Sequence, residues 1–65
     1  MKLNPKKNYK DIYDGTVRTG AGWMRWFKEV VEDDHRDYGM TTTVGEYLEL
    51  FTSNSGECDH HLIEV

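Results

Sequence analysis

One amphipathic stripe limits the fold of this chain more than any other feature of its sequence. Between residues 21 and 38, apolar and aromatic side chains recur at three- and four-residue spacing, as on one face of an α-helix. The stripe comprises Trp23, Trp26, Phe27, Val30, Val31, Asp34 and Tyr38. Gly39 follows it and is a typical left-handed helix stop. This pattern predicts a helix from about Ala21 to Tyr38.

A second, shorter helix is predicted to start at Thr42 or Thr43. Thr43 and Glu46 have the spacing of a capping box, in which each side chain accepts a hydrogen bond from a free backbone N–H of the first turn. The apolar positions of this helix are Val44, Tyr47, Leu48 and Phe51. Gly45 costs about 1 kcal/mol relative to alanine inside a helix, so either the helix begins late or another backbone passes close to it.

The remaining chain predicts short strands. Residues 11–19 contain β-forming side chains around Asp14-Gly15, which indicates one strand or a strand broken by a turn there. Residues 58–65 alternate in polarity and predict a terminal strand that pairs with the strand near Val17. We therefore expect an α+β fold: a single small domain, residues 11–65, with a two-helix hairpin packed on a short β-hairpin or a pair of terminal strands. Residues 1–10, polar and rich in lysine, are expected to form a flexible basic arm.

The length of the chain argues against most enzymes. With 65 residues and 37% hydrophobic side chains it can form one thin core, but not a deep pocket beside a cofactor domain. One cysteine cannot form an internal disulfide, which favours a reducing compartment. No apolar run reaches the length of a membrane span, and no signal peptide follows the first lysines. We expect a cytoplasmic, non-enzymatic protein that has no membrane partner.

Candidate metal ligands and nucleophiles gather near the end of the sequence. Cys58, Asp59, His60 and His61 lie together, with His35 far upstream, but their spacing is not that of a tetrahedral zinc site. The two acids that flank Cys58 oppose a reactive thiolate. We predict no catalytic residue, no metal ligand and no cofactor, with a weak or partner-shared metal site at Cys58, His60 and His61 left as an alternative.

Charge is the most informative functional signal. Residues 1–10 carry four lysines, whereas residues 11–65 carry twelve acids against four bases. Five of these acids fall within nine residues of the first helix: Glu29, Glu32, Asp33, Asp34 and Asp37. They occupy its C-terminal half, where the helix dipole disfavours anions. Fixed carboxylates can replace backbone phosphates in a basic groove.

These features predict a binding protein. We expect an acidic inhibitor that occupies the basic surface of a nucleic-acid-handling protein, as compact anti-restriction and anti-CRISPR proteins of phages do. Its contact residues are expected to be Glu29, Glu32, Asp33, Asp37, Glu46 and Glu49, with Trp23 or Tyr47 as an aromatic anchor. The two tryptophans of the first helix can instead both belong to the core or to a dimer interface.

One alternative is direct DNA binding. The order strand, helix, glycine turn and capped helix resembles a ribbon-helix-helix domain, with residues 39–48 as its inter-helix segment. The resemblance covers roughly a third of the chain and implies a dimeric DNA-binding regulator or antitoxin. Base and phosphate contacts would then come from Arg18 and from Lys2, Lys6, Lys7 and Lys10. A homodimer or a larger self-assembly that buries the tryptophan stripe is a further alternative.

Overall fold

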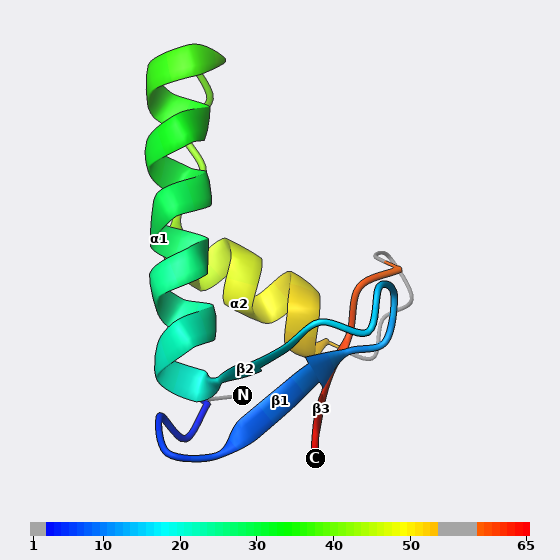
Figure 1. Cartoon of the computed structure of the whole chain (residues 1–65). Coiled ribbons are helices and arrows are strands. Elements are labelled where there is room, and N and C mark those ends of the chain that lie inside the picture. Colours follow the sequence, from blue (N-terminus) through cyan, green and yellow to red (C-terminus); the bar gives the residue numbers. More distant parts are fainter. Residues whose placement is uncertain (1–2, 54–58) are drawn as a thin grey trace.

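The fold is α+β: two helices pack on one side of a three-stranded antiparallel sheet (Figure 1). The structure is a computed structural model that describes residues 3–53 and 59–65. In chain order its elements are β1 (Asn8–Asp11), β2 (Val17–Thr19), α1 (Gly20–Asp37), α2 (Val44–Thr52) and β3 (Leu62–Glu64). The strand order across the sheet is β2-β1-β3.

The turn expected at Asp14-Gly15 is confirmed, and it joins β1 to β2. Gly15 has φ +79, a backbone conformation that residues with a Cβ adopt at a cost. The Asp14 carboxylate accepts a hydrogen bond from the Thr16 N–H at 2.9 Å, and this bond lowers the pKa of Asp14. Tyr9 pairs with Arg18 in the resulting hairpin.

Two expectations about the sheet are wrong. The terminal strand β3 pairs with β1, not with the strand near Val17, and β1 lies in the middle of the sheet. Residues 3–10, the described part of the expected arm, are not separate from the domain, because β1 begins at Asn8 and the side chains of Leu3 and Tyr9 are buried. The polar composition of this segment gave no signal for the core positions Leu3 and Tyr9 or for β1, the central strand.

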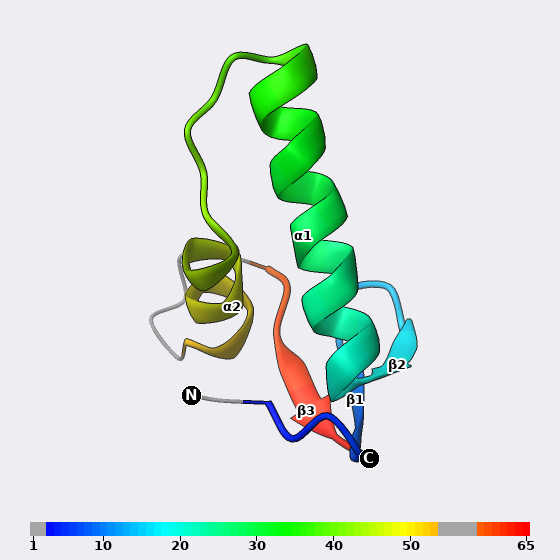
Figure 2. The same ribbon diagram turned by 90° about the vertical axis from the view of Figure 1, so that its left-hand side faces the viewer.

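Both helices begin and end close to where the sequence predicts. Thr19 caps α1 by accepting a hydrogen bond from the Gly22 N–H, and Gly39 follows the helix with φ +62. The capping box of Thr43 and Glu46 is present at the start of α2. Figure 2 shows the connection between the helices returning beside the C-terminal half of α1.

Aromatic rings make most of the core. Its buried members are Leu3, Tyr9, Trp23, Phe27, Phe51 and Leu62. The Phe27 ring lies 5.1 Å from that of Phe51, edge to face, and joins α1 to α2. The Trp23 indole N–H donates to the Tyr9 carbonyl at 2.9 Å and joins α1 to the sheet. Rings and one buried hydrogen bond therefore connect the two helices and the sheet in a single core.

Candidate interaction surface

Four exposed carboxylates lie on the C-terminal half of α1. We call Glu29, Glu32, Asp33 and Asp37 the carboxylate row; all four are exposed. Glu29, Asp33 and Asp37 follow one another every four residues, about 6 Å of helix rise, and Glu32 lies beside them. The opposite side of the same helix carries the buried Trp23 and Phe27. The amphipathic pattern that buries these rings therefore also aligns the carboxylates.

Arg36 belongs to the same surface and pairs with two members of the row. Its guanidinium donates to Asp33 and, at 3.2 Å, to Asp37, and the bond to Asp37 raises the pKa of Arg36. All three side chains are more than half exposed. Ion pairs this exposed contribute little stability, so a partner can draw Arg36 aside at small cost.

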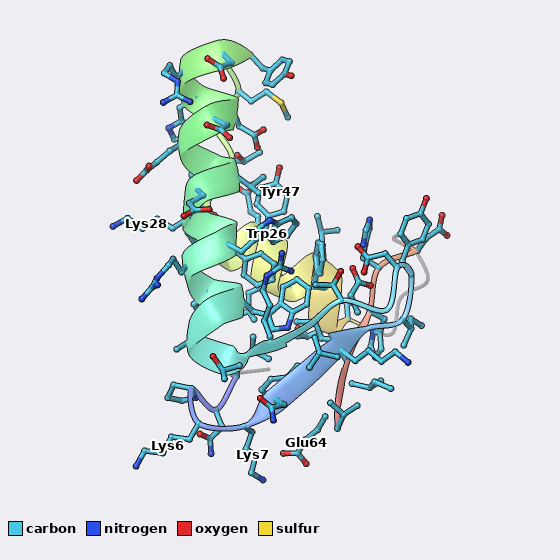
Figure 3. All side chains as sticks on the ribbon, in the orientation of Figure 1. Lys6, Lys7, Trp26, Lys28, Tyr47 and Glu64 are labelled. Carbon is cyan, nitrogen blue, oxygen red and sulfur yellow. The ribbon has the colours of Figure 1, made fainter. Side chains whose placement is uncertain are left out.

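The density of charge on the carboxylate row approaches that of one nucleic-acid strand. The row extends about 12 Å along the helix, because each residue adds 1.5 Å. With Arg36 included, its net charge corresponds to roughly one negative charge per 4 Å, against 3.4 Å per phosphate along one strand of DNA. Two basic residues, Arg25 and Lys28, precede the row on the same helix. Figure 3 shows Lys28 pointing away from α2. The negative surface is thus restricted to the C-terminal half of α1.

The fifth acid of this helix, Asp34, has an internal role. Its side chain is 8% exposed and accepts hydrogen bonds from the hydroxyls of Tyr47 and Thr42. These two bonds lower the pKa of Asp34, and the bond to Asp34 raises the pKa of Tyr47. The Asp34 carbonyl also accepts from the N–H groups of Tyr38 and Met40. Asp34 therefore ties both α2 and the connection between the helices to α1.

Asp34 could have been identified from the sequence as a buried residue. It occupies a position of the apolar stripe, where a carboxylate needs partners to remain ionised. Its partners, Thr42 and Tyr47, lie 8 and 13 positions further along the chain. No local pattern indicates which hydroxyls those partners are.

The prediction that Trp23 is an aromatic anchor for a partner is wrong. Its side chain is 1% exposed, and its indole N–H donates a hydrogen bond to the Tyr9 carbonyl. Trp26 is half-buried, with its ring 5.6 Å from that of Trp23 and edge to face. The Arg18 guanidinium lies over both rings, 4.6 Å from Trp23 and 5.3 Å from Trp26. Trp23 thus belongs to the core, and Trp26 packs against the core from its partly exposed side.

Tyr47 is half-buried, and its contacts are with the core side of α1. Its ring stacks on Phe27 at 6.4 Å, and its hydroxyl is held by Asp34. Figure 3 shows Tyr47 and Trp26 on the side of α1 opposite to Lys28. Tyr47 therefore joins α2 to α1 through the Phe27 ring and the Asp34 carboxylate.

The acids of α2 do not extend the carboxylate row into one band. Glu46 and Glu49 are exposed on the side of α2 opposite to Tyr47 and Phe51, the rings that pack on α1. Because the helices face each other through those rings, their outer sides point in different directions. Glu46 is also occupied at the start of α2, where its carboxylate accepts from the Thr43 N–H at 3.4 Å.

The structure reveals a hydrogen bond between two side chains, Asp11 and His60, that the sequence did not predict. Asp11, 2% exposed, accepts hydrogen bonds from the Tyr13 N–H at 3.0 Å and from His60 Nδ1 at 2.6 Å. The His60 ring lies between Tyr13, at 4.5 Å, and Phe51, at 4.9 Å. Asp11 and His60 are 49 positions apart, so no local motif could have indicated this contact.

The candidate metal residues do not form a described site. Within residues 3–53 and 59–65, no group of three or more His, Cys, Asp or Glu side chains is arranged to hold a metal ion. His60 is hydrogen-bonded to Asp11, and Cys58 lies outside the described residues.

Neither helix in the described part combines the length and apolar composition needed to cross a membrane.

The basic residues of the DNA-binding alternative are partly used within the chain. Arg18 lies over the tryptophans, and its strand β2 is paired with β1. Lys7 forms an ion pair with Glu64 at 2.9 Å, which raises the pKa of Lys7. Figure 3 shows Lys6 and Lys7 near the sheet, far from Lys28. Lys2 lies outside the described residues.

Comparison of the chain with protein families, curated proteins and solved structures finds no match.

Proposed function

We propose that this protein is a non-enzymatic inhibitor whose carboxylate row occupies the basic, nucleic-acid-binding surface of a protein partner. The observation that carries the proposal is the alignment of Glu29, Asp33 and Asp37 on one exposed side of α1, with Glu32 beside them. Their net charge spacing resembles that of phosphates along a strand, so Lys and Arg side chains arranged for nucleic acid can contact them.

The proposed surface is also held in place. α1 is anchored along its buried side by Trp23, Phe27 and Asp34. A helix fixed in this way presents its carboxylates with little further ordering on binding, and ordering is one of the main costs of association. Charge of this kind acts mainly by accelerating encounter with an oppositely charged partner, so binding should weaken steeply as salt rises.

The test is quantitative affinity capture from a nuclease-treated bacterial lysate, with two variants of equal charge. Glu29→Lys/Glu32→Lys reverses charge within the row, whereas Glu49→Lys/Asp59→Lys reverses the same amount elsewhere; all four residues are exposed. We expect the wild type and the second variant to capture the same nucleic-acid-binding protein, and the first variant to lose it. Heparin, a polyanion, should displace that protein from the wild type.

Circular dichroism of both variants checks that their helices are intact. Equal loss of the partner by the two variants would mean that total charge matters and the carboxylate row does not. A captured protein that heparin leaves bound would contradict the idea of nucleic-acid mimicry.

A further inference from the structure

The open side of the sheet is a second surface with a different composition. Tyr9, Asp11 and Leu62 point toward the helices and are buried. Side chains at the alternate positions point the opposite way, and the register places Lys10 between Val17 on β2 and Ile63 on β3. In the described part of the chain both helices lie on the other side of the sheet (Figure 1).

This open side is mainly aliphatic, and the same alternation adds the polar residues Asn8, Thr19 and His61. Ile12, Val17, Ile63 and Val65 are 54%, 51%, 42% and 60% exposed. Ile12 and Val65 continue the ladder beyond the strands, since the Ile12 N–H donates to His61 and the Val65 N–H donates to Asn8. Half of the large apolar side chains that are exposed in the described residues therefore gather here. We call these four residues and Lys10 the Lys10 face.

Lys10 forms no ion pair with the part of the chain that the structure describes. The ion pairs there join Lys7 to Glu64 and Arg36 to Asp33 and Asp37, while Asp11 is hydrogen-bonded to His60. The register gives Lys10 two aliphatic neighbours across the strands, Val17 and Ile63. If a partner covers this face, Lys10 loses water and needs an anion in return.

We propose that the Lys10 face binds a protein segment that presents aliphatic side chains around an Asp or Glu carboxylate. The charge of Lys10 selects this occupant. A second copy packed face to face would cover Lys10 without supplying an anion, because the Lys10 face contains no acid. Single-stranded nucleic acid is a poor fit, because the Lys10 face offers its phosphates a single cation, set among aliphatic side chains.

The proposal does not depend on the carboxylate row. The Lys10 face lies on the sheet and the row lies on α1, so variants in one leave the other intact. A protein with both surfaces can hold an acidic, apolar segment of one molecule while its helix contacts the basic surface of another.

A random-peptide library displayed on phage provides the test. We expect peptides selected on the immobilised wild type to combine Leu, Ile, Val or Phe with Asp or Glu, and to contain few Lys or Arg. Affinity of the selected peptides should fall at least about tenfold for Lys10→Glu, a change of about 1.4 kcal/mol. Selection on Lys10→Glu itself should yield peptides with Lys or Arg in place of the acid.

Lys28→Glu is the matched control, because it makes the same charge change on the outer side of α1 (Figure 3). It should leave affinity for the selected peptides unchanged. Ile63→Asn should weaken the same peptides by removing apolar contact. Circular dichroism and thermal unfolding confirm that each variant is folded.

Several results would overturn the proposal. Failure to enrich any peptide on the wild type is one, and enrichment of basic peptides that Lys28→Glu and Lys10→Glu affect equally is another. Sedimentation velocity adds a third: a dimer that Val17→Asn dissociates would assign the Lys10 face to a second copy of this chain.

Discussion

At the scale of single residues, Gly20 shows how a few atoms decide whether the segments fit. A Cβ built at Gly20 would lie 2.2 Å from the Asn4 carbonyl oxygen, a distance that real Cβ atoms do not reach. The close approach arises because the Gly20 N–H donates to the Lys7 carbonyl at 2.9 Å. This glycine is needed for space, whereas Gly15 and Gly39 are needed for positive φ.

The first prediction contrasts two glycines of the helices. Gly20→Ala should lower the free energy of unfolding by about 1–3 kcal/mol, because the segment before β1 must move away from α1. Gly45→Ala should raise it by up to about 1 kcal/mol, since its Cβ would meet only the Thr43 hydroxyl, at 3.9 Å, and alanine favours the helix. Urea unfolding of both variants measures the difference. Equal stability of Gly20→Ala and the wild type would show that this close approach is absent.

At the scale of elements, hydrogen bonds to Asp34 hold the C-terminal half of α1 to α2 and to the connection between the helices. The helix extends beyond α2, and the connection that runs beside it is held by polar bonds (Figure 2). Thr42 donates to the Asp34 carboxylate, and the Thr42 carbonyl lies 2.7 Å from His35 Nε2. This half of the helix therefore depends on the ionisation of Asp34.

The second prediction concerns pH. The pKa of Asp34 is lowered in the folded state, so its bonds stabilise the fold above the ordinary aspartate pKa, and this stabilisation is lost as pH falls through the folded pKa. Tyr47→Phe removes the largest cause of the shift and should cost about 1 kcal/mol at neutral pH. The difference from the wild type should shrink below about pH 3.9. Thermal unfolding across this range tests the expectation.

Tyr38→Phe is the control for this experiment. It removes the same hydroxyl from a side chain that is 75% exposed. Stability should be unchanged at every pH. A Tyr47→Phe deficit that stays constant into acid would mean that Asp34 is not the group through which Tyr47 acts.

The helices could be predicted from the sequence because their signals are local. The stripe before Gly39 and the box of Thr43 and Glu46 both lie within a few residues of what they specify. The sheet was harder, because alternation identifies a strand but not its neighbour, and the pairing expected with the strand near Val17 was wrong. Tyr9 and Leu3 were missed because each is a single apolar residue among lysines and other polar residues.

The same distinction applies to the candidate surface. The carboxylate row belongs to one helix, so helical spacing alone aligned Glu29, Asp33 and Asp37. Whether Glu46 and Glu49 join them depends on how two helices pack. Trp23 and Trp26 are three positions apart in one stripe, and the position of β1 determines that Trp23 is the deeper one.

At the scale of the whole molecule, the end of the described chain completes the sheet. β3 covers the free edge of β1, and His60 holds the Asp11 carboxylate just before that strand begins. Asp11 is buried at 2% exposure, so its carboxylate needs this partner. The Asp11–His60 bond therefore helps to hold β3 against β1.

The third prediction tests this dependence. His60→Ala leaves the Asp11 carboxylate with the Tyr13 N–H alone and should lower the free energy of unfolding by about 1–3 kcal/mol. His61→Ala, the adjacent half-buried histidine, should have a smaller effect. Guanidinium unfolding monitored by tryptophan fluorescence compares the two. If the two variants lose the same stability, the pair with Asp11 contributes nothing of its own.

The central position of β1 has a consequence for the order of folding. The β1–β2 hairpin and both helices are formed from neighbouring residues, whereas β3 reaches β1 only by closing a loop of nearly the whole chain. Closing that loop costs conformational entropy before any of its contacts form, so such pairings are slow compared with local ones. We therefore expect the edge of β1 that faces β3 to pair after the edge that faces β2, so that the hairpin and the helices form before the sheet is complete.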